Sequence, residues 1–149
     1  MEAIIESLNN VDSEVCAYAS KALGALTSES PQFVDICLRK LRSILHDSAQ
    51  SSPFRLACSQ AFCEIIARSD RVTKQLVSQL LSNISKNELH LKESYLGVFI
   101  YLPMITGQRF KEFVYDVVDT VVTCIQEDNK KIRNLAIRSM KIIIKNFLF

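Results

Sequence analysis

A repeated helical face constrains the fold of this chain more than any other feature of its sequence. When the chain is aligned on the anchors Val15, Phe54, Leu91 and Ile132, apolar or small residues recur four, seven, eight and eleven positions after each anchor. Those recurring residues are Ala19, Ala22, Leu23, Leu26; Cys58, Ala61, Phe62, Ile65; Tyr95, Val98, Phe99, Leu102; and Ala136, Ser139, Met140, Ile143. Offsets of 0, 4, 7, 8 and 11 trace one face of an α-helix. The sequence therefore predicts four similar amphipathic helices.

The distance between anchors indicates the kind of repeat. Successive anchors lie 39, 37 and 41 residues apart, which exceeds the ~34 of tetratricopeptide repeats and falls in the HEAT and armadillo range. Two helices fit each period, and an amphipathic segment precedes each anchored helix, at about 2–9, 31–45, 71–84 and 108–126. We expect an all-α fold: an α-α superhelix, or HEAT-repeat solenoid, of about four antiparallel helix pairs.

Proline and glycine mark the borders of these units. Only three of each occur in 149 residues, and 48% of the chain is hydrophobic, which favours packed helices with few turns. Pro31 and Pro53 each follow a serine, a pattern typical of an N-cap followed by the first helical residue. Pro103 and Gly107 are predicted to end the third anchored helix. The expected units are about 1–29, 30–69, 70–106 and 107–149.

Small residues at offsets four and seven are expected to let neighbouring helices approach closely. The residues predicted to be almost wholly buried are Ala19, Ala22, Cys58, Ala61, Val98 and Ala136. A natural solenoid ends in capping repeats with a polar outer face, whereas this sequence ends in the apolar stretch Ile142 to Phe149. We therefore expect a fragment of a longer array with apolar side chains exposed at its ends.

Four stretches of the chain resemble one known family in their order and spacing. They are Ala19–Leu26 (ASKALGAL), Glu93–Pro103 (ESYLGVFIYLP), Ile105–Phe110 and Glu127–Arg138. They are similar to segments in the middle of the general control nonderepressible translational activator, a very large HEAT array. Together they cover nearly the whole chain.

The resemblance implies that this chain corresponds to the part of the activator that is similar to the HEAT region of elongation factor three. In the family, that region is associated with ribosome contact and with an ABC-type partner protein, and the activator signals to the kinase of the α subunit of initiation factor 2. Three positions depart from the family pattern: Cys16 replaces arginine, Gln108 replaces aspartate, and Asn134 replaces an acid. Only Asp128 and Arg133 remain well placed for the Asp–Arg ladder that is common between HEAT repeats.

Motifs for chemistry are missing from the sequence. It contains no nucleotide-binding, serine-hydrolase or zinc-protease motif, so we predict no enzyme activity, no catalytic residue, no cofactor and no small-molecule substrate. His46 and His90 lack neighbouring ligands at metal-binding spacing and are expected to be solvated. Carboxylates such as Glu93 are also expected on solvated faces. The five cysteines form no CxxC pair, and Cys58 is expected to serve packing rather than redox chemistry.

Charge and hydropathy bear on partners and location. The net charge of +2 provides no strong overall attraction to nucleic acid or membrane. No apolar run approaches the ~20 residues of a membrane span, and the N-terminus lacks the pattern of a signal peptide. We expect a cytoplasmic protein without membrane contact.

The C-terminal segment carries a local excess of basic residues. After Asp128 there are six basic residues and no acidic ones. Arg138, Lys141 and Lys145 follow helical spacing and should share one face, which, together with Arg133, is a candidate contact for ribosomal RNA phosphates. The alternative is an ordinary solvated face, favoured by the helix dipole near a C-terminus.

The leading hypothesis is a non-enzymatic scaffold segment of a translational activator that binds ribosomes and partner proteins in the amino-acid-starvation response. One alternative is a general HEAT scaffold of the transport-receptor or phosphatase type, which contacts only protein. The other is the regulatory HEAT region of an ATPase similar to elongation factor three.

Overall fold

Helices make up most of the computed structural model, which describes residues 1–148. The α-helices are α1 (Glu2–Ser7), α2 (Ser13–Glu29), α3 (Val34–Leu45), α4 (Ser52–Arg68), α5 (Lys74–Ser85), α6 (Leu89–Thr106), α7 (Val114–Ile125) and α8 (Lys130–Ile143). Two 3-10 segments, Pro31–Phe33 and Gly107–Phe113, lead into α3 and α7, and a π-helical turn, Ile144–Leu148, follows α8. No strand occurs in residues 1–148, which confirms the all-α prediction.

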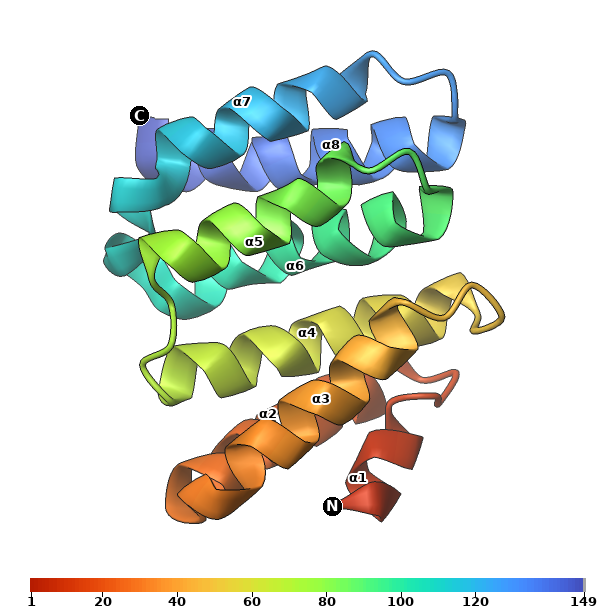
Figure 1. Cartoon of the computed structure of the whole chain (residues 1–149), viewed down its shortest axis with the longest axis vertical. Helices are drawn as coiled ribbons and strands as arrows, with labels where there is room; N and C mark the ends of the chain where they lie inside the picture. Colours follow the sequence, from red (N-terminus) through yellow and green to blue (C-terminus); the bar gives the residue numbers. More distant parts are fainter. Residues whose placement is uncertain (149) are drawn as a thin grey trace.

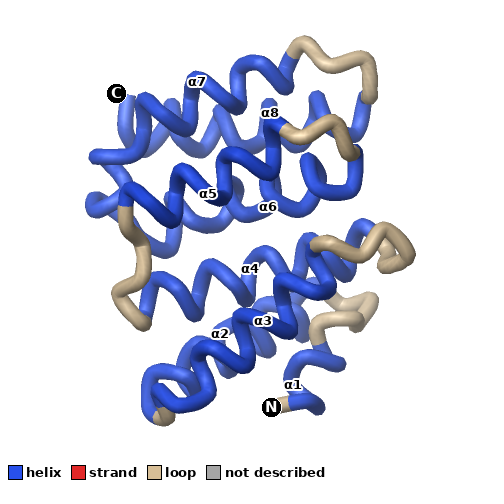
Figure 2. The backbone as a smooth tube through the Cα atoms, in the orientation of Figure 1, coloured by secondary structure: helices blue, strands red, loops and turns tan. Residues whose placement is uncertain are grey.

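The helices form antiparallel pairs that stack into two layers. Figure 1 shows α3, α5 and α7 in front, with α2, α4, α6 and α8 behind them. The main contacts run along the rear layer, from α2 to α4 to α6 to α8, and each front helix packs on the next helix in sequence. Loops gather at the two edges of the stack (Figure 2). Within residues 1–148 no helix has both the length and the apolarity needed to cross a bilayer.

Side-chain caps start three of the four rear-layer helices, α2, α4 and α8. Asp12 accepts a hydrogen bond from Glu14 N at α2, and Asn129 accepts from Lys131 N and Ile132 N at α8. At α4 the prediction was wrong by one residue, because the capping hydroxyl belongs to Ser51 and accepts from Phe54 N at 3.3 Å. Ser52 is already the first helical residue, and its hydroxyl is free for a contact with another repeat.

Pro103 was expected to end the third anchored helix, but it lies inside α6, which continues to Thr106. Gly107 provides the actual end, with a positive φ of 61° that favours glycine. Because proline has no N–H, the carbonyl of Phe99, four residues earlier, loses its helical donor. Ser139 of α8 supplies one instead: its hydroxyl donates to Phe99 O at 2.9 Å in a fully buried position.

The repeated face forms the core, with one exception. The second, third and fourth units bury the anchor and the residues four, seven and eleven positions after it. The first unit departs from this burial pattern: Ala22, which was predicted to be buried, is exposed. Val15 and Tyr18 beside it are 36% and 70% exposed. In later units such positions meet the preceding rear-layer helix: Ser94 (offset three) contacts Ser59 of α4, and Ser139 (offset seven) contacts Phe99 of α6. Within residues 1–148, α2 has no rear-layer helix before it.

Candidate interaction surface

A polar ladder links the repeats along one loop edge of the stack. Its members stand one position after each anchor: Cys16, Arg55, Lys92 and Arg133. Three of them bind carbonyls in the loop just before their own helix: Cys16 with Leu8 O and Asn10 O, Arg55 with Gln50 O, and Arg133 with Glu127 O and Asp128 O. The thiol of Cys16 thus makes the kind of contact that arginine makes in the second and fourth units.

Two rungs of the ladder cross between repeats. Arg55 Nη2 lies 3.2 Å from Glu93 Oε2, and Lys92 pairs with Glu127. Both cations are largely buried, as is Glu93. Glu93 was expected on a solvated face, and that expectation was wrong because α4 and α6 close over it. Asp128 and Arg133 were expected to be well placed for an Asp–Arg ladder between repeats, but Arg133 donates to the backbone carbonyl of Asp128, in the loop before its own helix, and not to the carboxylate.

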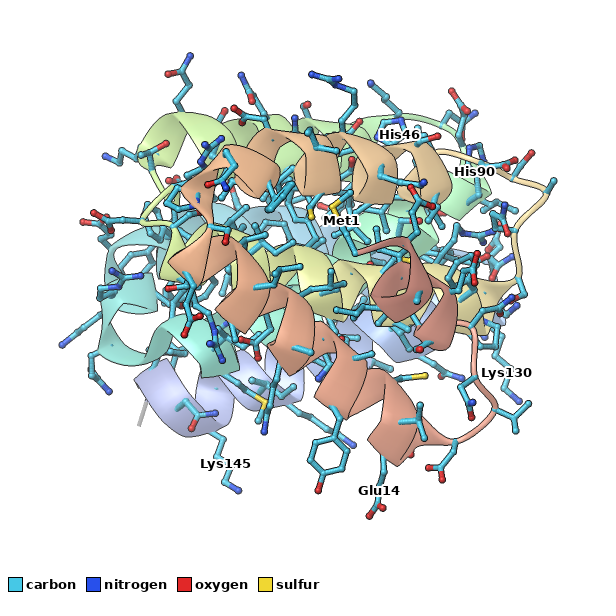
Figure 3. The ribbon with its side chains drawn as sticks, turned by 90° about the horizontal axis from the view of Figure 1, so that it is seen from below. Met1, Glu14, His46, His90, Lys130 and Lys145 are labelled. Carbon is cyan, nitrogen blue, oxygen red and sulfur yellow. The ribbon has the colours of Figure 1, made fainter. Side chains whose placement is uncertain are left out.

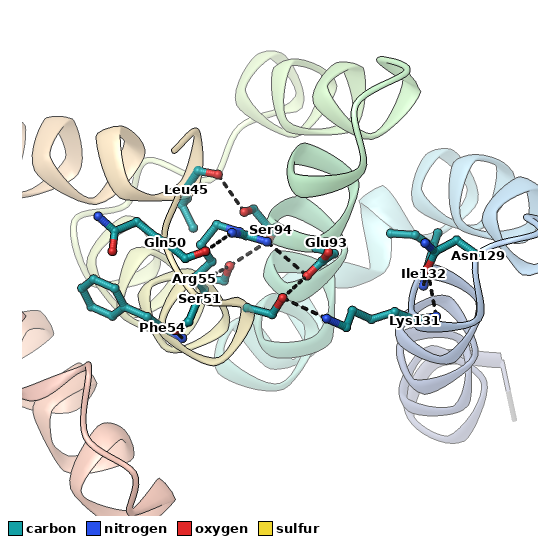
Figure 4. Close-up of polar contacts among 12 residues, drawn as sticks. Leu45, Gln50, Ser51, Phe54, Arg55, Glu93, Ser94, Asn129, Lys131 and Ile132 are labelled. Atoms are coloured by element: carbon teal, nitrogen blue, oxygen red, sulfur yellow. Dashed lines mark hydrogen bonds and ion pairs between the residues drawn. The ribbon is translucent and has the colours of Figure 1, made fainter. Parts of the chain in front are cut away.

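Glu93 is the centre of a wider network that joins three rear-layer helices (Figure 4). Ser52 Oγ donates to Glu93 Oε2 at 2.6 Å and accepts from Lys131 Nζ of α8 at 3.1 Å. Ser94 Oγ donates to Leu45 O at 2.8 Å, which attaches α6 to the end of α3. Single-sequence reasoning missed this network because its members lie 38 to 79 residues apart.

The structure separates the four predicted basic contact residues into two groups. Arg133 is half-buried, and its guanidinium is engaged by the two loop carbonyls at 2.7 and 2.9 Å. Arg138, Lys141 and Lys145 are exposed, and within residues 1–148 none of them forms an ion pair. Arg138 and Lys141 lie on α8, whereas Lys145 lies in the π-helical turn that follows. Figure 3 shows Lys130 and Lys145 at opposite ends of this segment.

Lys141 differs from its two neighbours in its place within the repeat. It stands nine positions after its anchor, where the earlier units have Gly24, Cys63 and Ile100, all buried. Gly24 at this position meets the side chains of Arg68 and Glu64 on α4, so offset nine faces the following rear-layer helix. On α8 the same side also exposes Ile137 and Ile144, each 37% exposed. Lys141 therefore lies on the stacking side of α8.

Arg138 and Lys145 stand at offsets six and thirteen. The first unit exposes Lys21 and Ser28 at these offsets, and the third exposes Met104 at offset thirteen. At offset six the third unit instead buries Gly97 against Leu56 and Ser59 of α4, the preceding rear-layer helix. Arg138 and Lys145 thus lie toward the open face of the rear layer, away from the side on which a following helix would stack, with Arg138 nearer the preceding helix.

His46 is exposed, as expected from the sequence, but its ring also contacts a buried residue. Its Nε2 lies 2.5 Å from the hydroxyl of Tyr95, a fully buried residue of α6. Burial of the ring, together with the nearby Lys86, lowers the pKa of His46. Burial raises the pKa of Tyr95 to about 12, so its hydroxyl keeps its proton and can donate to a neutral imidazole. Figure 3 shows His46 and His90 on the same side of the molecule.

The cysteines serve packing, as predicted for Cys58. Cys37, Cys58, Cys63 and Cys124 are buried, Cys16 is half-buried, and all five are free thiols. Burial raises the pKa of Cys58 to about 12, which disfavours the reactive thiolate. In the part of the chain that the structure describes, no three His, Cys, Asp or Glu side chains gather closely enough to hold a metal ion.

Comparison with known proteins gives one consistent similarity. The chain is 26% identical over 135 residues to the "eIF-2-alpha kinase activator GCN1" of Saccharomyces cerevisiae, covering 88% of this chain and 5% of that protein. It is 24% identical over 139 residues to the human "Stalled ribosome sensor GCN1", covering 90% and 5%. The Dictyostelium discoideum activator of the same name is 25% identical over 137 residues, again covering 90% and 5%.

No protein-family model matches the sequence, and no solved structure matches it significantly. The chain spans about 5% of the length of the curated relatives it matches. Over nine-tenths of its own length it is similar to one segment of the GCN1 activators, which confirms the family resemblance found in the sequence.

Proposed function

We propose that this chain, which is similar to a segment of the GCN1 activators, is a non-enzymatic scaffold segment of a cytoplasmic translational activator. In this role it contacts ribosomes and partner proteins, including an ABC-type translation protein, during the response to amino-acid starvation. The observation that carries the proposal is the agreement among relatives whose names describe a kinase activator and a ribosome sensor. A stack of helix pairs suits such a role, because it offers an extended surface without a catalytic centre.

We also propose that the chain works as part of a longer helical array. Its relatives are about twenty times longer, since it spans 5% of each. The positions that earlier units bury against the next helix are exposed in the fourth unit, at Ile137, Lys141 and Ile144. Another helix pair packed on α8 would cover them as α4 covers Gly24.

Within this scaffold, the proposed contact with ribosomal RNA is formed by Arg138 and Lys145, with Lys141 beside them on the stacking side of α8. All three cations are exposed and free of ion pairs in the described part of the chain, so they can meet phosphate without breaking an internal contact. Arg133 is a weaker member, because its guanidinium already satisfies two loop carbonyls. Arg138 and Lys145 remain available even when a further repeat covers Lys141.

The test is co-sedimentation of the chain with ribosomes across a salt series. Each neutralised phosphate contributes a slope of about 0.7 to 0.9 in log K against log salt. Changing Arg138 and Lys145 to glutamate should abolish ribosome binding or lower the salt slope by the contribution of roughly two phosphate contacts. The free energy of unfolding should change by well under ~1 kcal/mol. In the full-length protein Lys141→Glu should have less effect than the double change, because of its place on the stacking side.

A matched control places the same charge change elsewhere. Lys74→Glu with Lys111→Glu alters two exposed lysines outside α8, one at the start of α5 and one in the segment Gly107–Phe113, and should leave ribosome binding nearly unchanged. Lys92 is unsuitable as a control, because it pairs with Glu127 inside the stack. If the Arg138 and Lys145 double variant binds as the wild type does at every salt concentration, the RNA contact is wrong and a scaffold that contacts only protein is favoured.

A further inference from the structure

A basic groove lies between α3 and α5 in the front layer, away from the basic face of α8. In Figure 1 these two helices diverge, with α4 behind them. The groove has a volume of about 470 Å³. Its floor is apolar, formed by Leu38, Ile66 and Leu76. Its walls carry three arginines and one carboxylate: Arg39, Arg42, Arg71 and Asp35.

Local contacts orient two of the three arginines. Arg71 Nη1 lies 2.6 Å from Asp35 Oδ1, an ion pair that ties the α4–α5 loop to the start of α3. The guanidinium of Arg42 sits 5.4 Å from the ring centroid of Phe62, which fixes one face of the cation against the core. Arg39 lies one helical turn from both Asp35 and Arg42 on α3. Within residues 1–148, neither Arg39 nor Arg42 has an acidic partner, so the groove carries a net charge of +2.

The charge and the floor together define the chemistry of an occupant. Two unpaired guanidinium groups favour an anion, and the planar fork of arginine matches a carboxylate through two parallel hydrogen bonds. The leucine and isoleucine floor favours an apolar side chain between the anionic groups. We infer that this groove binds an acidic segment of a partner protein, in which carboxylates flank an apolar residue.

RNA fits the groove less well than an acidic peptide. Single-stranded RNA binds basic grooves by stacking its bases on exposed aromatic rings. No aromatic side chain lines the groove, and Phe62 beneath Arg42 is fully buried. A phosphate backbone would also leave the apolar floor without a partner, whereas one peptide residue can cover it. This surface is thus distinct in place and in partner from the proposed RNA contact on α8, and either can fail without the other.

The test is an NMR titration of the ¹⁵N-labelled chain with a short peptide of a central leucine flanked by two glutamates on each side. Saturable shifts should map to the backbone amides of α3, α5 and the intervening α4–α5 loop. Replacing the peptide's glutamates with glutamines, or its leucine with serine, should each weaken binding severalfold. Arg39→Glu should raise the Kd at least about tenfold, because it turns one attraction into a repulsion.

A variant with the same charge change provides the control. Lys111→Glu alters an exposed lysine outside the groove and should leave the peptide Kd within about twofold of wild type. Equal weakening by both variants, or shifts spread over every basic residue, would mean that only net charge matters and would overturn the inference. The inference would also be overturned if a uridine hexanucleotide, and not the peptide, shifted the backbone amide signals of the groove residues.

A second copy of the chain is the remaining possible occupant, because α7 exposes Asp116 and Asp119. Sedimentation at rising concentration, showing association that Arg39→Glu abolishes, would assign the groove to self-assembly and refute binding of a separate acidic partner. A wild-type monomer that binds the peptide supports the inference.

Discussion

The hydrogen bond from Ser139 to Phe99 O yields the most specific stability prediction. Pro103 removes the N–H that would normally bond to this carbonyl, and Ser139 of the next repeat replaces it at 2.9 Å. Changing Ser139 to alanine should leave a buried carbonyl without a donor. The methyl group itself fits this site, because the second unit has Ala61 at the same offset and buries it fully.

The expected loss of stability in Ser139→Ala comes from the unsatisfied carbonyl rather than from a cavity. A buried polar group that loses its partner costs about 1–3 kcal/mol. For a domain of this size each kcal/mol lowers Tm by roughly 2–4 °C. Ser139→Ala should therefore lower the free energy of unfolding by ~1–3 kcal/mol, measured by urea denaturation followed by circular dichroism.

A double-mutant cycle isolates the cause. Pro103→Ala restores a backbone N–H that can donate to Phe99 O, so in that background Ser139→Ala should cost about 1 kcal/mol less than in the wild type. The cycle cancels any loss of packing caused by the proline change itself.

A matched serine gives the control. Ser20 is also fully buried, and its hydroxyl donates to Cys16 O at 2.9 Å, a carbonyl inside the regular helix α2. Because that carbonyl keeps its helical donor, Ser20→Ala should change stability by under ~0.5 kcal/mol. The reasoning fails if Ser139→Ala costs no more than this control, or if its cost is the same with and without Pro103.

Three further predictions follow from burial. Ala61→Leu should overpack the core and cost ~1–3 kcal/mol, whereas Ala22→Leu at the same offset should cost under ~0.5 kcal/mol because Ala22 is exposed. Chemical denaturation compares the two variants, and equal costs would contradict the exposure of Ala22. The pKa of His46 in the folded chain lies below its usual 6.5, so as the pH falls the unfolded chain takes up the proton first. The contribution of His46 to stability is therefore complete above pH 6.5 and declines below it. Denaturation at pH 7.5 and 5.5 should show a smaller loss of stability for His46→Gln than for the wild type, and an equal loss would refute this role of His46. With its pKa raised to about 12, Cys58 should react with iodoacetamide at pH 8 only when the chain unfolds. Rapid labelling of Cys58 in the folded chain, detected by mass spectrometry, would contradict the burial of this thiol.

The sequence alone determined the helices and the core face of three units. Apolar residues at offsets 0, 4, 7, 8 and 11 can share a surface only on an α-helix, so periodicity was sufficient to predict the all-α fold and the burial of residues such as Cys58 and Val98. The same reasoning correctly predicted the exposure of Arg138, Lys141 and Lys145, since their offsets of six, nine and thirteen fall outside this set of core positions.

Only the tertiary structure decided what each position meets. Ala22 repeats the sequence pattern but is exposed, because burial at offset seven requires a preceding helix. Arg133 looked like a surface cation, yet its guanidinium binds the loop before its own helix. Glu93 is held between repeats by Arg55, 38 residues away, and the basic groove combines residues of α3, α4, α5 and a loop. Helical periodicity is a local property of the chain, whereas these contacts depend on how one repeat is set against the next.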